Sequence, residues 1–241
     1  MAHPRHSLFD VTAERVELVT PHMKRITVDG SSLPSFRPGL PAQWLKVFVP
    51  GAATGRAYTV RRFNRVSKRI ELDFVLHGDN GPVSAWAARV QPGEAFRISG
   101  THPRSGVAAA PAASRILLFG DETALPAVGS ILETLPAHAR AEAFVEVADA
   151  SEEQAIESSA GVSLTWLHRG DATNGASLEA AAQALGRPPA DTIIWIAAES
   201  STVAALRRLA LSEWGVDRSR LHAAGYWKRG EANHRDEDGS S

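Results

Sequence analysis

The stretch RILLFGDETALPAVGSILETL, residues 115–135, passes directly from one kind of secondary structure to another. Its first part, RILLFG, is an apolar run typical of a buried strand, and ALPAVGSILETL has the apolar spacing of a helix. A buried strand that runs into a helix is the repeating unit of a parallel sheet, because parallel strands need crossover connections. The stretch therefore predicts an α/β domain in this part of the chain.

The same rhythm continues toward the carboxyl end. Apolar strand patterns are found in AEAFVEVA, VSLTWLH and DTIIWIAA, and helical patterns in SLEAAAQAL and TVAALRRLALSEWG. Their alternation predicts a mostly parallel sheet with helices on its faces.

The first hundred residues have a different pattern, one of short strands separated by turn residues. In RIELDFVLH, residues 69–77, Ile70, Leu72, Phe74 and Leu76 alternate with a mixed second face, which is typical of a strand with one core side. The spacing predicts a small antiparallel β-barrel. Its expected strands are residues 15–19, 23–28, 44–49, 56–63, 69–77 and 95–99.

Between these halves lies SGVAAAPAAS, residues 105–114. This segment consists mainly of small residues, contains proline and shows neither the helical nor the strand periodicity. We therefore expect a barrel domain over residues 1–108 and an α/β domain over residues 109–230. The polar end, residues 231–241, is expected to be a mobile tail.

The composition excludes several classes of function. The net charge is −1, so no global field attracts nucleic acid or an anionic membrane surface. The absence of cysteine excludes disulfides, thiolate metal sites and catalytic thiols, and the histidines show no metal-ligand spacing outside HPRH at residues 3–6. Neither a signal peptide nor an apolar run of membrane-spanning length is present, so we expect a cytoplasmic protein without membrane insertion.

The segment RAYTVR, residues 56–61, combines three useful side chains. Arg56 can pair with phosphate, the ring of Tyr58 can cover an aromatic ring system, and the hydroxyl of Thr59 can hydrogen-bond to a ring nitrogen. Together these tasks fit a flavin nucleotide. The segment is equally consistent with an exposed barrel strand whose arginines are solvated.

A turn and a helix start follow at HGDNGPVSAWAARV, residues 77–90. Pro82 suits the first turn of a helix, and the amides of that turn can bind a pyrophosphate, which Gly81 allows to approach closely. The alternative is an ordinary capped helix that closes the barrel, with Trp86 in the core and His77 bound to a backbone group.

Two further segments are candidates in the second half. GDETALP, residues 120–126, lies at the carboxyl end of a predicted parallel strand, where such folds bind ligands. Its alternative role is a helix cap by Thr123, with Asp121 and Glu122 near the helix's positive end. AAGYWKRG, residues 223–230, is either a last strand with a solvated basic pair or an aromatic lid with a basic rim.

Taken in order, five segments resemble the siderophore-interacting protein family, the flavin-dependent ferric-siderophore reductases. They are RAYTVRRFN, DFVLHGDNGPVSAWA, LLFGDETALPAVGSILETLP, WIAAES and GYWKRG. The resemblance runs from about residue 23 to residue 230. It implies a ferredoxin-reductase-like architecture, in which the barrel binds FAD and the α/β domain binds NADPH or NADH.

The resemblance also implies a role for each matching residue. Arg56 contacts the FAD phosphates, Tyr58 covers the isoalloxazine and Thr59 hydrogen-bonds near its reactive nitrogen. The other implied cofactor-binding residues are Phe74, Val75 and His77 along the ring and ribityl chain, Gly81, Val83 and Ser84 at the pyrophosphate, Asp121, Thr123 and Ala124 from the second domain, and Trp227 as a shielding aromatic.

The implied reaction transfers electrons from a reduced nicotinamide, or from a ferredoxin, through FAD to siderophore-bound Fe(III). No side chain is assigned a catalytic role, because the flavin carries the chemistry. Since ferric siderophores are often anionic, Lys228, Arg229 and Arg104 are the candidate substrate-binding residues. We expect the protein to act as a monomer.

Two alternatives belong to other functional classes. One is a flavoprotein of the same architecture that passes electrons to a protein acceptor. The other is a siderophore-binding module without redox activity.

Overall fold

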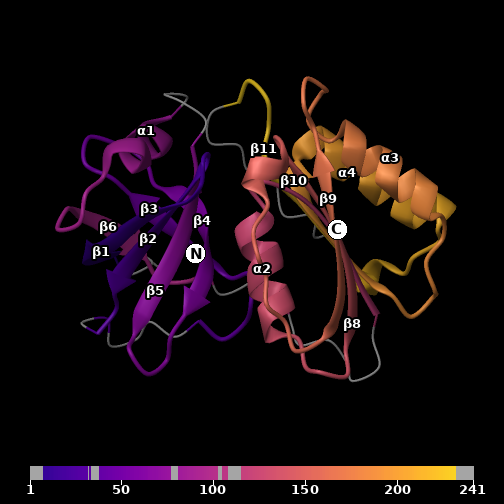
Figure 1. The fold of residues 1–241 in the computed structure, drawn as a ribbon, viewed down its shortest axis with the longest axis horizontal. Helices are drawn as coiled ribbons and strands as arrows, with labels where there is room; N and C mark the ends of the chain where they lie inside the picture. The colour runs from indigo at the N-terminus through magenta and orange to yellow at the C-terminus, as the bar shows by residue number, and fades with distance from the viewer. Residues whose placement is uncertain are drawn as a thin grey trace, which may run out of the picture. The chain divides into compact units, whose positions relative to one another are not determined.

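The computed structural model describes residues 8–31, 33, 38–76, 81–102, 105–107 and 115–231. The chain folds as two compact units, Met1–Ala108 and Ala109–Ser241 (Figure 1). The expected tail lies outside the described residues, except for Glu231. Each unit is described below by itself.

The first unit is a closed barrel of six strands in the order β1-β2-β5-β4-β3-β6, and all of its strand pairs are antiparallel. A short helix, α1 (Pro82–Arg89), connects β5 to β6. The antiparallel barrel predicted from the sequence is thereby confirmed. Its strands are β1 (Leu8–Thr20), β2 (Met23–Asp29), β3 (Trp44–Phe48), β4 (Arg56–Phe63), β5 (Arg69–Val75) and β6 (Ala95–Ser99).

The alternation in β5 has the predicted effect on the barrel core. Ile70, Leu72 and Phe74 are fully buried and belong to one hydrophobic cluster that also includes Trp86 of α1. On the opposite face of the strand, Asp73 is also buried, because Arg25 of β2 binds both of its carboxylate oxygens at 2.6 and 2.7 Å. The strand therefore carries apolar residues inside the barrel and a shielded ion pair outside.

β1 is longer than the expected strand at residues 15–19. Its first part, Leu8–Thr12, pairs with β6, and its second part, from Ala13 onward, pairs with β2. A register shift between Ala13 and Arg15 lets the one strand serve both neighbours. This shared strand closes the barrel.

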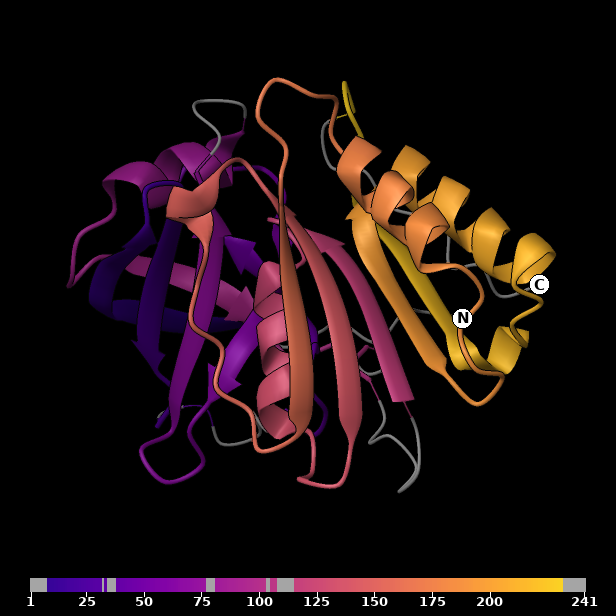
Figure 2. The same ribbon diagram turned by 45° about the vertical axis from the view of Figure 1, so that its right-hand side comes forward.

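The second unit is a five-stranded sheet in the order β11-β10-β7-β8-β9, and every strand pair is parallel. Helix α2 lies on one face, and α3 and α4 lie together on the other (Figure 2). The predicted α/β architecture is confirmed. The strands are β7 (Arg115–Asp121), β8 (Arg140–Val147), β9 (Gly161–His168), β10 (Ile193–Glu199) and β11 (Leu221–Trp227), and the helices are α2 (Leu125–Thr134), α3 (Ala176–Leu185) and α4 (Ser200–Arg208), which continues as a π-helical turn over Leu209–Glu213.

Parallel pairing places all carboxyl ends of these strands at one edge of the sheet, called the carboxyl edge below. Because β10, β7 and β8 are neighbours, the acidic residues at their ends come close in space. These residues are Glu199, Asp121 and Glu146, and all three are buried. The candidate site of the second unit lies at this edge.

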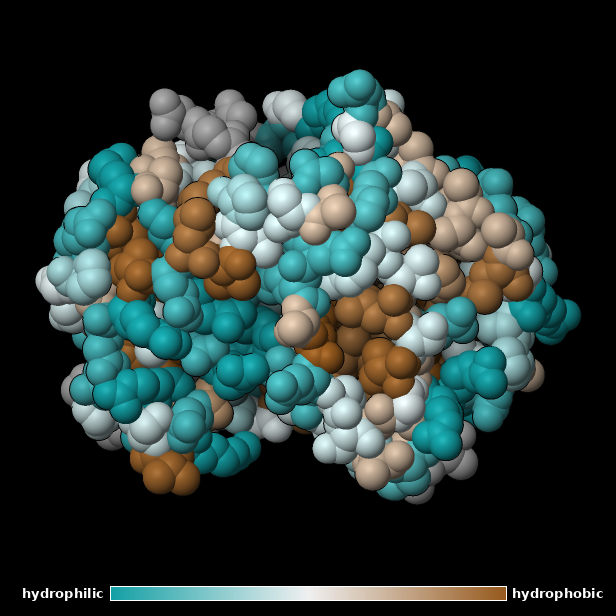
Figure 3. Space-filling model, viewed as in Figure 1, coloured by the Kyte–Doolittle hydropathy of each residue, from teal (hydrophilic) through white to brown (hydrophobic). Residues whose placement is uncertain are grey.

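On the visible face of the molecule, hydrophobic residues form separate small patches among mostly hydrophilic residues (Figure 3). Among the described residues, none of the helices is long and apolar enough to cross a membrane.

Candidate functional site

The aromatic side chains beside RAYTVR form a connected group in the barrel. The ring centroids of Tyr58 and Phe74 are 4.4 Å apart, and Phe74 meets the ring of Trp86 edge-on at 6.0 Å. Since Phe74 is fully buried in the core, it supports the ring of Tyr58 from behind. Burial raises the pKa of the Tyr58 hydroxyl, so this side chain is a neutral aromatic surface.

The polar residues of β4 have different environments. Arg56 is partly exposed, and its Nη1 donates to the hydroxyl of Thr54 at 3.1 Å. Thr59 is buried and pairs in register with Trp44 of β3, whose ring stacks on His102 at 4.3 Å. The guanidinium of Arg56 is therefore accessible to an anion, whereas Thr59 is enclosed.

The start of α1 is suited to an anion. Among the described residues, no side chain caps this helix end. A Cβ added to Gly81 would meet no atom of the described residues within 4 Å, so no described side chain fills the space beside the turn. Ser84 joins the turn to the end of β5 by donating to the carbonyl of Val75 at 3.3 Å. The geometry fits a pyrophosphate at the amides of the first turn.

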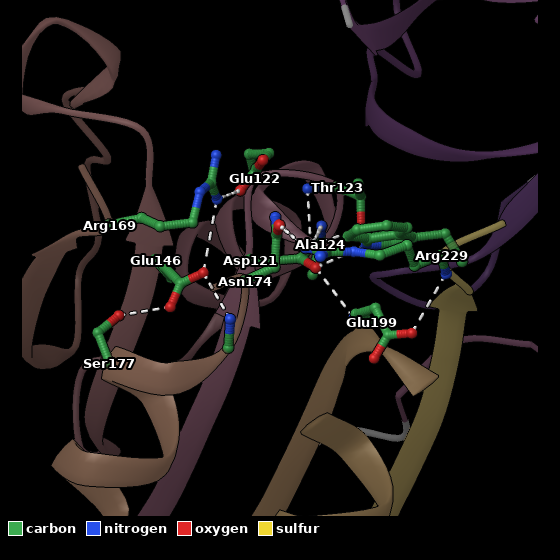
Figure 4. Close-up of polar contacts among 12 residues, drawn as sticks. Asp121, Glu122, Thr123, Ala124, Glu146, Arg169, Asn174, Ser177, Glu199 and Arg229 are labelled. Carbon is green, nitrogen blue, oxygen red and sulfur yellow. Dashed lines mark hydrogen bonds and ion pairs between the residues drawn. The ribbon is translucent and has the colours of Figure 1, made fainter. Parts of the chain in front are cut away.

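At the carboxyl edge of the second unit, Asp121 is a hydrogen-bond centre (Figure 4). Its Oδ1 accepts from the amide and hydroxyl of Thr123 and from the amide of Ala124. Its Oδ2 accepts from the amide of Glu199 at 3.0 Å and from the indole Nε1 of Trp227 at 2.8 Å. The carboxylate thus connects the ends of β7, β10 and β11.

The environment of Asp121 also changes its acidity. Burial, reinforced by the negative charge of Glu122, raises the pKa of Asp121 to about 6, although hydrogen bonds from Thr123 and Trp227 act in the opposite direction. Asp121 is therefore a carboxylate at neutral pH and titrates in mildly acidic solution.

The structure contradicts the alternative role of Thr123 as a helix cap. Ala124 is the N-cap residue of α2, and the hydroxyl of Thr123 donates to Asp121 instead of accepting from the helix. Asp121 accepts the amides of Thr123 and Ala124 because a strand-end carboxylate reaches both of them. The aspartate therefore holds the turn that precedes α2, and the N-cap residue itself provides no side-chain cap.

Carboxylates stand at the starts of the other two helices as well. Glu146 of β8, with no exposed surface, accepts from the amide of Gly175 at the start of α3 and from the hydroxyl of Ser177. Glu199 of β10 accepts from the amides of Ser201 and Thr202 at the start of α4. Each of these helix starts already holds an internal anion, which disfavours binding of a phosphate there.

The Glu199 carboxylate stays ionised. Burial tends to raise its pKa, but hydrogen bonds from Ser201, Arg229 and Thr202 outweigh burial and lower the pKa below its ordinary value. Negative charge therefore persists at this edge at all physiological pH values.

The expected basic rim lies directly after β11. Lys228 forms an exposed ion pair with Glu231, and the Arg229 guanidinium donates to the side-chain oxygen of Asn174 at 2.8 Å. The backbone amide of Arg229 donates to Glu199 at 3.3 Å. Both cations thus have partners within the unit, although the pair made by Lys228 is weak because it is solvated.

The structure brings the expected residues together as two sets, one in each unit. Two of them, His77 and Arg104, lie outside the described residues. The first set consists of Arg56, Tyr58 and Thr59 on β4, Phe74 and Val75 on β5, and Gly81, Val83 and Ser84 at the start of α1, and the second consists of Asp121, Thr123, Ala124, Trp227, Lys228 and Arg229.

Sequence reasoning missed Glu146, Glu199 and Arg169 at the carboxyl edge. The Arg169 guanidinium donates to Glu122 at 2.8 Å and approaches Glu146 at 3.5 Å. A usable signal was present, because each glutamate interrupts an apolar strand near its carboxyl end, where a charge needs a specific partner.

Comparison with known proteins identifies the family. The model of the siderophore-interacting protein family matches residues 113–230, and that of the siderophore-interacting FAD-binding domain matches residues 51–105. The chain is 29% identical to the ferric vibriobactin reductase ViuB of Vibrio cholerae, over 90% of this chain and 88% of that protein. It is 32% identical to the uncharacterized protein Rv2895c of Mycobacterium tuberculosis, over 94% and 91% of the two chains.

Solved structures agree with this result. The siderophore utilization protein from T. fusca has a TM-score of 0.83 at 33% identity and covers 95% of both chains. A ferredoxin-NADP+ reductase from Plasmodium falciparum, at 10% identity, covers 89% of this chain and 95% of its own with a TM-score of 0.74, which confirms the ferredoxin-reductase-like fold. The chain therefore belongs to the siderophore-interacting protein family and is an FAD-binding oxidoreductase.

Proposed function

We propose that this protein is a ferric-siderophore reductase that uses FAD to pass electrons from a reduced nicotinamide to siderophore-bound Fe(III). The observation that carries the flavin site is the open start of α1, which contrasts with the carboxylate-occupied helix starts of the second unit. The similarity to ViuB, which is named a ferric vibriobactin reductase, supports the acceptor.

The barrel residues are proposed to hold FAD through complementary contacts. Gly81, Val83 and Ser84 offer the first-turn amides of α1 to the pyrophosphate, and Arg56 adds positive charge. Tyr58 presents a neutral ring to the isoalloxazine, and Thr59 offers its hydroxyl to the ring's edge. Bound FAD supplies the conversion of a two-electron hydride donor to one-electron transfer.

The remaining assigned residues follow the family resemblance. Val75 and His77 are proposed to line the flavin, with Phe74 packed behind the ring of Tyr58. In the second unit, Asp121, Thr123, Ala124 and Trp227 are proposed to serve the same cofactor.

Binding of the ferric siderophore is assigned to Lys228 and Arg229, together with Arg104. The Lys228 side chain is 46% exposed and forms a solvated ion pair with Glu231. Such a pair contributes about 0–1 kcal/mol, so an anionic chelate can replace the glutamate at little cost.

The electron donor is proposed to be NADH or NADPH, with a reduced ferredoxin as the other donor to test. The protein is proposed to act as a monomer in the cytoplasm, where both donors occur.

Two variants of Gly81 test the flavin site sharply. Gly81→Ala adds a methyl group that meets no described atom and should retain FAD, whereas Gly81→Asp adds a carboxylate at the helix start and should weaken FAD binding at least tenfold. Flavin absorbance after dialysis and FAD titration of the apoprotein measure the effect. Equal FAD affinity of the two variants would refute this placement of the pyrophosphate.

Turnover then tests the reaction. The purified holoprotein is mixed with NADH or NADPH, ferric catecholate or ferric hydroxamate chelates, and a ferrous trap. Flavin-dependent ferrous iron supports the proposal. A colourless protein that still binds the chelates would instead identify a binding module, and turnover only with a protein acceptor would identify the other flavoprotein class.

A further inference from the structure

The hydrogen bond between Asp121 and Trp227 joins residues far apart in the sequence. Its length is 2.8 Å, and the acceptor is the carboxylate oxygen that also accepts the amide of Glu199. Asp121 is buried, with 1% of its surface exposed. The pairing of Thr123 and Ala124 with Oδ1 leaves Oδ2 aimed at β10 and β11.

The backbone around Trp227 is irregular, so regular strand geometry does not set the direction of its side chain. Ala198 pairs with Gly225, but the next residue, Glu199, pairs with Trp227, which leaves Tyr226 as an extra residue on β11. A bulge of this kind changes the face to which the following side chain points. The indole therefore needs a side-chain contact that holds it in one orientation.

The contacts at this point divide into backbone and side-chain contacts. The hydroxyl of Ser200 donates to the carbonyl of Trp227 at 3.1 Å, and the amide of Arg229 donates to Glu199 at 3.3 Å. These bonds hold the main chain. Among the contacts of the described residues, the bond to Asp121 is the one that fixes the indole nitrogen.

We propose that Asp121 is a positioning residue, whose ionised carboxylate holds the indole N–H of Trp227 and thereby fixes the ring's orientation at the carboxyl edge. The consequence for electron transfer rests on the proposed function, which assigns Trp227 to the flavin. The orientation of the ring within the second unit does not depend on that function.

The acidity of Asp121 makes the contact sensitive to pH. Because burial raises the pKa of Asp121 to about 6, the carboxylate gains a proton just below neutrality and then has one acceptor position fewer for its donors. The indole ring of Trp227 should therefore become less fixed in orientation as pH falls through about 6. The charged groups around the same edge are Glu122, Glu146, Arg169, Glu199 and Arg229.

Nuclear magnetic resonance of the indole groups tests the contact directly. In protein labelled with ¹⁵N-tryptophan, the Trp227 indole signal is assigned by its loss in Trp227→Phe. The proposal expects this signal to shift with a midpoint near pH 6 in the wild type. In Asp121→Asn the Trp227 indole signal should have a different chemical shift, and this shift should not change between pH 7.5 and 5.

Asp171→Asn is the matched control, because it makes the same chemical change at an exposed position of the same unit. It should leave the Trp227 signal and its titration unchanged. The other indole signals report whether Asp121→Asn has kept its fold. A Trp227 signal that is the same in wild type and Asp121→Asn, and flat with pH, would overturn the proposal.

Trp227→Phe provides a second test should Asp121→Asn fail to fold, because it keeps an aromatic ring and removes the donor. Loss of this hydrogen bond should raise the pKa of Asp121. The ¹³C chemical shift of the Asp121 carboxyl group, recorded against pH, measures this pKa. An unchanged Asp121 titration in Trp227→Phe would also overturn the proposal.

Reductase kinetics connect the contact to the proposed function. Asp121→Asn and Trp227→Phe should each lower kcat by roughly five- to tenfold, the effect of one lost hydrogen bond, with no further loss in the double variant. Additive losses would contradict a shared role. If the protein lacks reductase activity, the proposed function fails, while the resonance experiments still decide the positioning role.

Discussion

At the residue scale, Asp121 shows how one buried carboxylate can organise a site. The pKa of Asp121 moves from 3.8 to about 6, mainly through burial. At 1.36 kcal/mol per pKa unit, keeping the charge inside costs about 3 kcal/mol at neutral pH. Natural proteins keep a buried charge of this kind where a specific arrangement of groups requires it. Here the Asp121 carboxylate joins three strand ends through hydrogen bonds.

This cost predicts how stability depends on pH. Because the folded-state pKa of Asp121 is raised, the native protein binds a proton before the unfolded chain does, and the contribution of Asp121 to stability increases as pH falls from 7.5 to 5. The wild type should gain about 1.4 kcal/mol relative to Asp121→Asn over this range. Urea unfolding of both proteins at the two pH values measures this, and a constant difference would contradict it.

Lys228 allows a test of substrate recognition at the same scale. Its exposed side chain is paired with Glu231, so Lys228→Glu should leave the fold and bound FAD unaltered. Since two negative charges would then face an anionic chelate, the apparent KM for anionic ferric siderophores should rise about tenfold. Lys228→Gln is expected to be intermediate. A KM that is the same for every anionic chelate would remove Lys228 from the site.

At the element scale, two of the barrel ion pairs that involve β5 differ greatly in their surroundings. Arg25 and Asp73 join β2 to β5 with side chains that are 14% and 1% exposed, whereas Arg69 and Glu14 are 48% and 39% exposed. Burial makes a pair expensive to break, because the remaining charge has no solvent. The inner pair therefore locks the register of β2 against β5.

Matched substitutions distinguish these pairs. Arg25→Met should destabilise the barrel by about 3–5 kcal/mol, because it removes the partner that binds both carboxylate oxygens of the buried Asp73, although Arg61 lies 3.8 Å from that carboxylate. Arg69→Met should cost no more than about 1 kcal/mol. Chemical denaturation measures both values, and similar losses for the two variants would show that the inner pair has no special role.

At the scale of the whole molecule, the two units differ in whether carboxylates already lie at their helix starts. Among the described residues, no side chain caps the start of α1 in the barrel, whereas in the α/β unit the carboxylates of Asp121, Glu146 and Glu199 accept from amides at the three helix starts. This charge distribution favours a phosphate-rich cofactor in the barrel. It disfavours additional phosphate at the carboxyl edge, where α/β sheets usually bind their ligands.

A preference between nicotinamide donors follows from this difference. NADPH carries one more phosphate than NADH, so kcat/KM should favour NADH by about tenfold, since like charges in contact disfavour binding. The preference should decrease as ionic strength rises, because salt screens the exposed part of the repulsion. Stopped-flow reduction of the flavin by each nucleotide at two salt concentrations tests this, and a salt-independent preference for NADPH would contradict it.

The sequence alone establishes the barrel, the parallel α/β sheet and the family, because apolar periodicity and ordered motifs are local properties of the chain. It places Tyr58, Gly81 and Asp121 in the correct elements. Only the tertiary structure decides that Thr123 donates to Asp121 instead of capping α2, and that Glu199 and Trp227 share the same carboxylate. Those contacts join separate strand ends at one edge of the sheet, and no local pattern specifies which buried donor a carboxylate will meet.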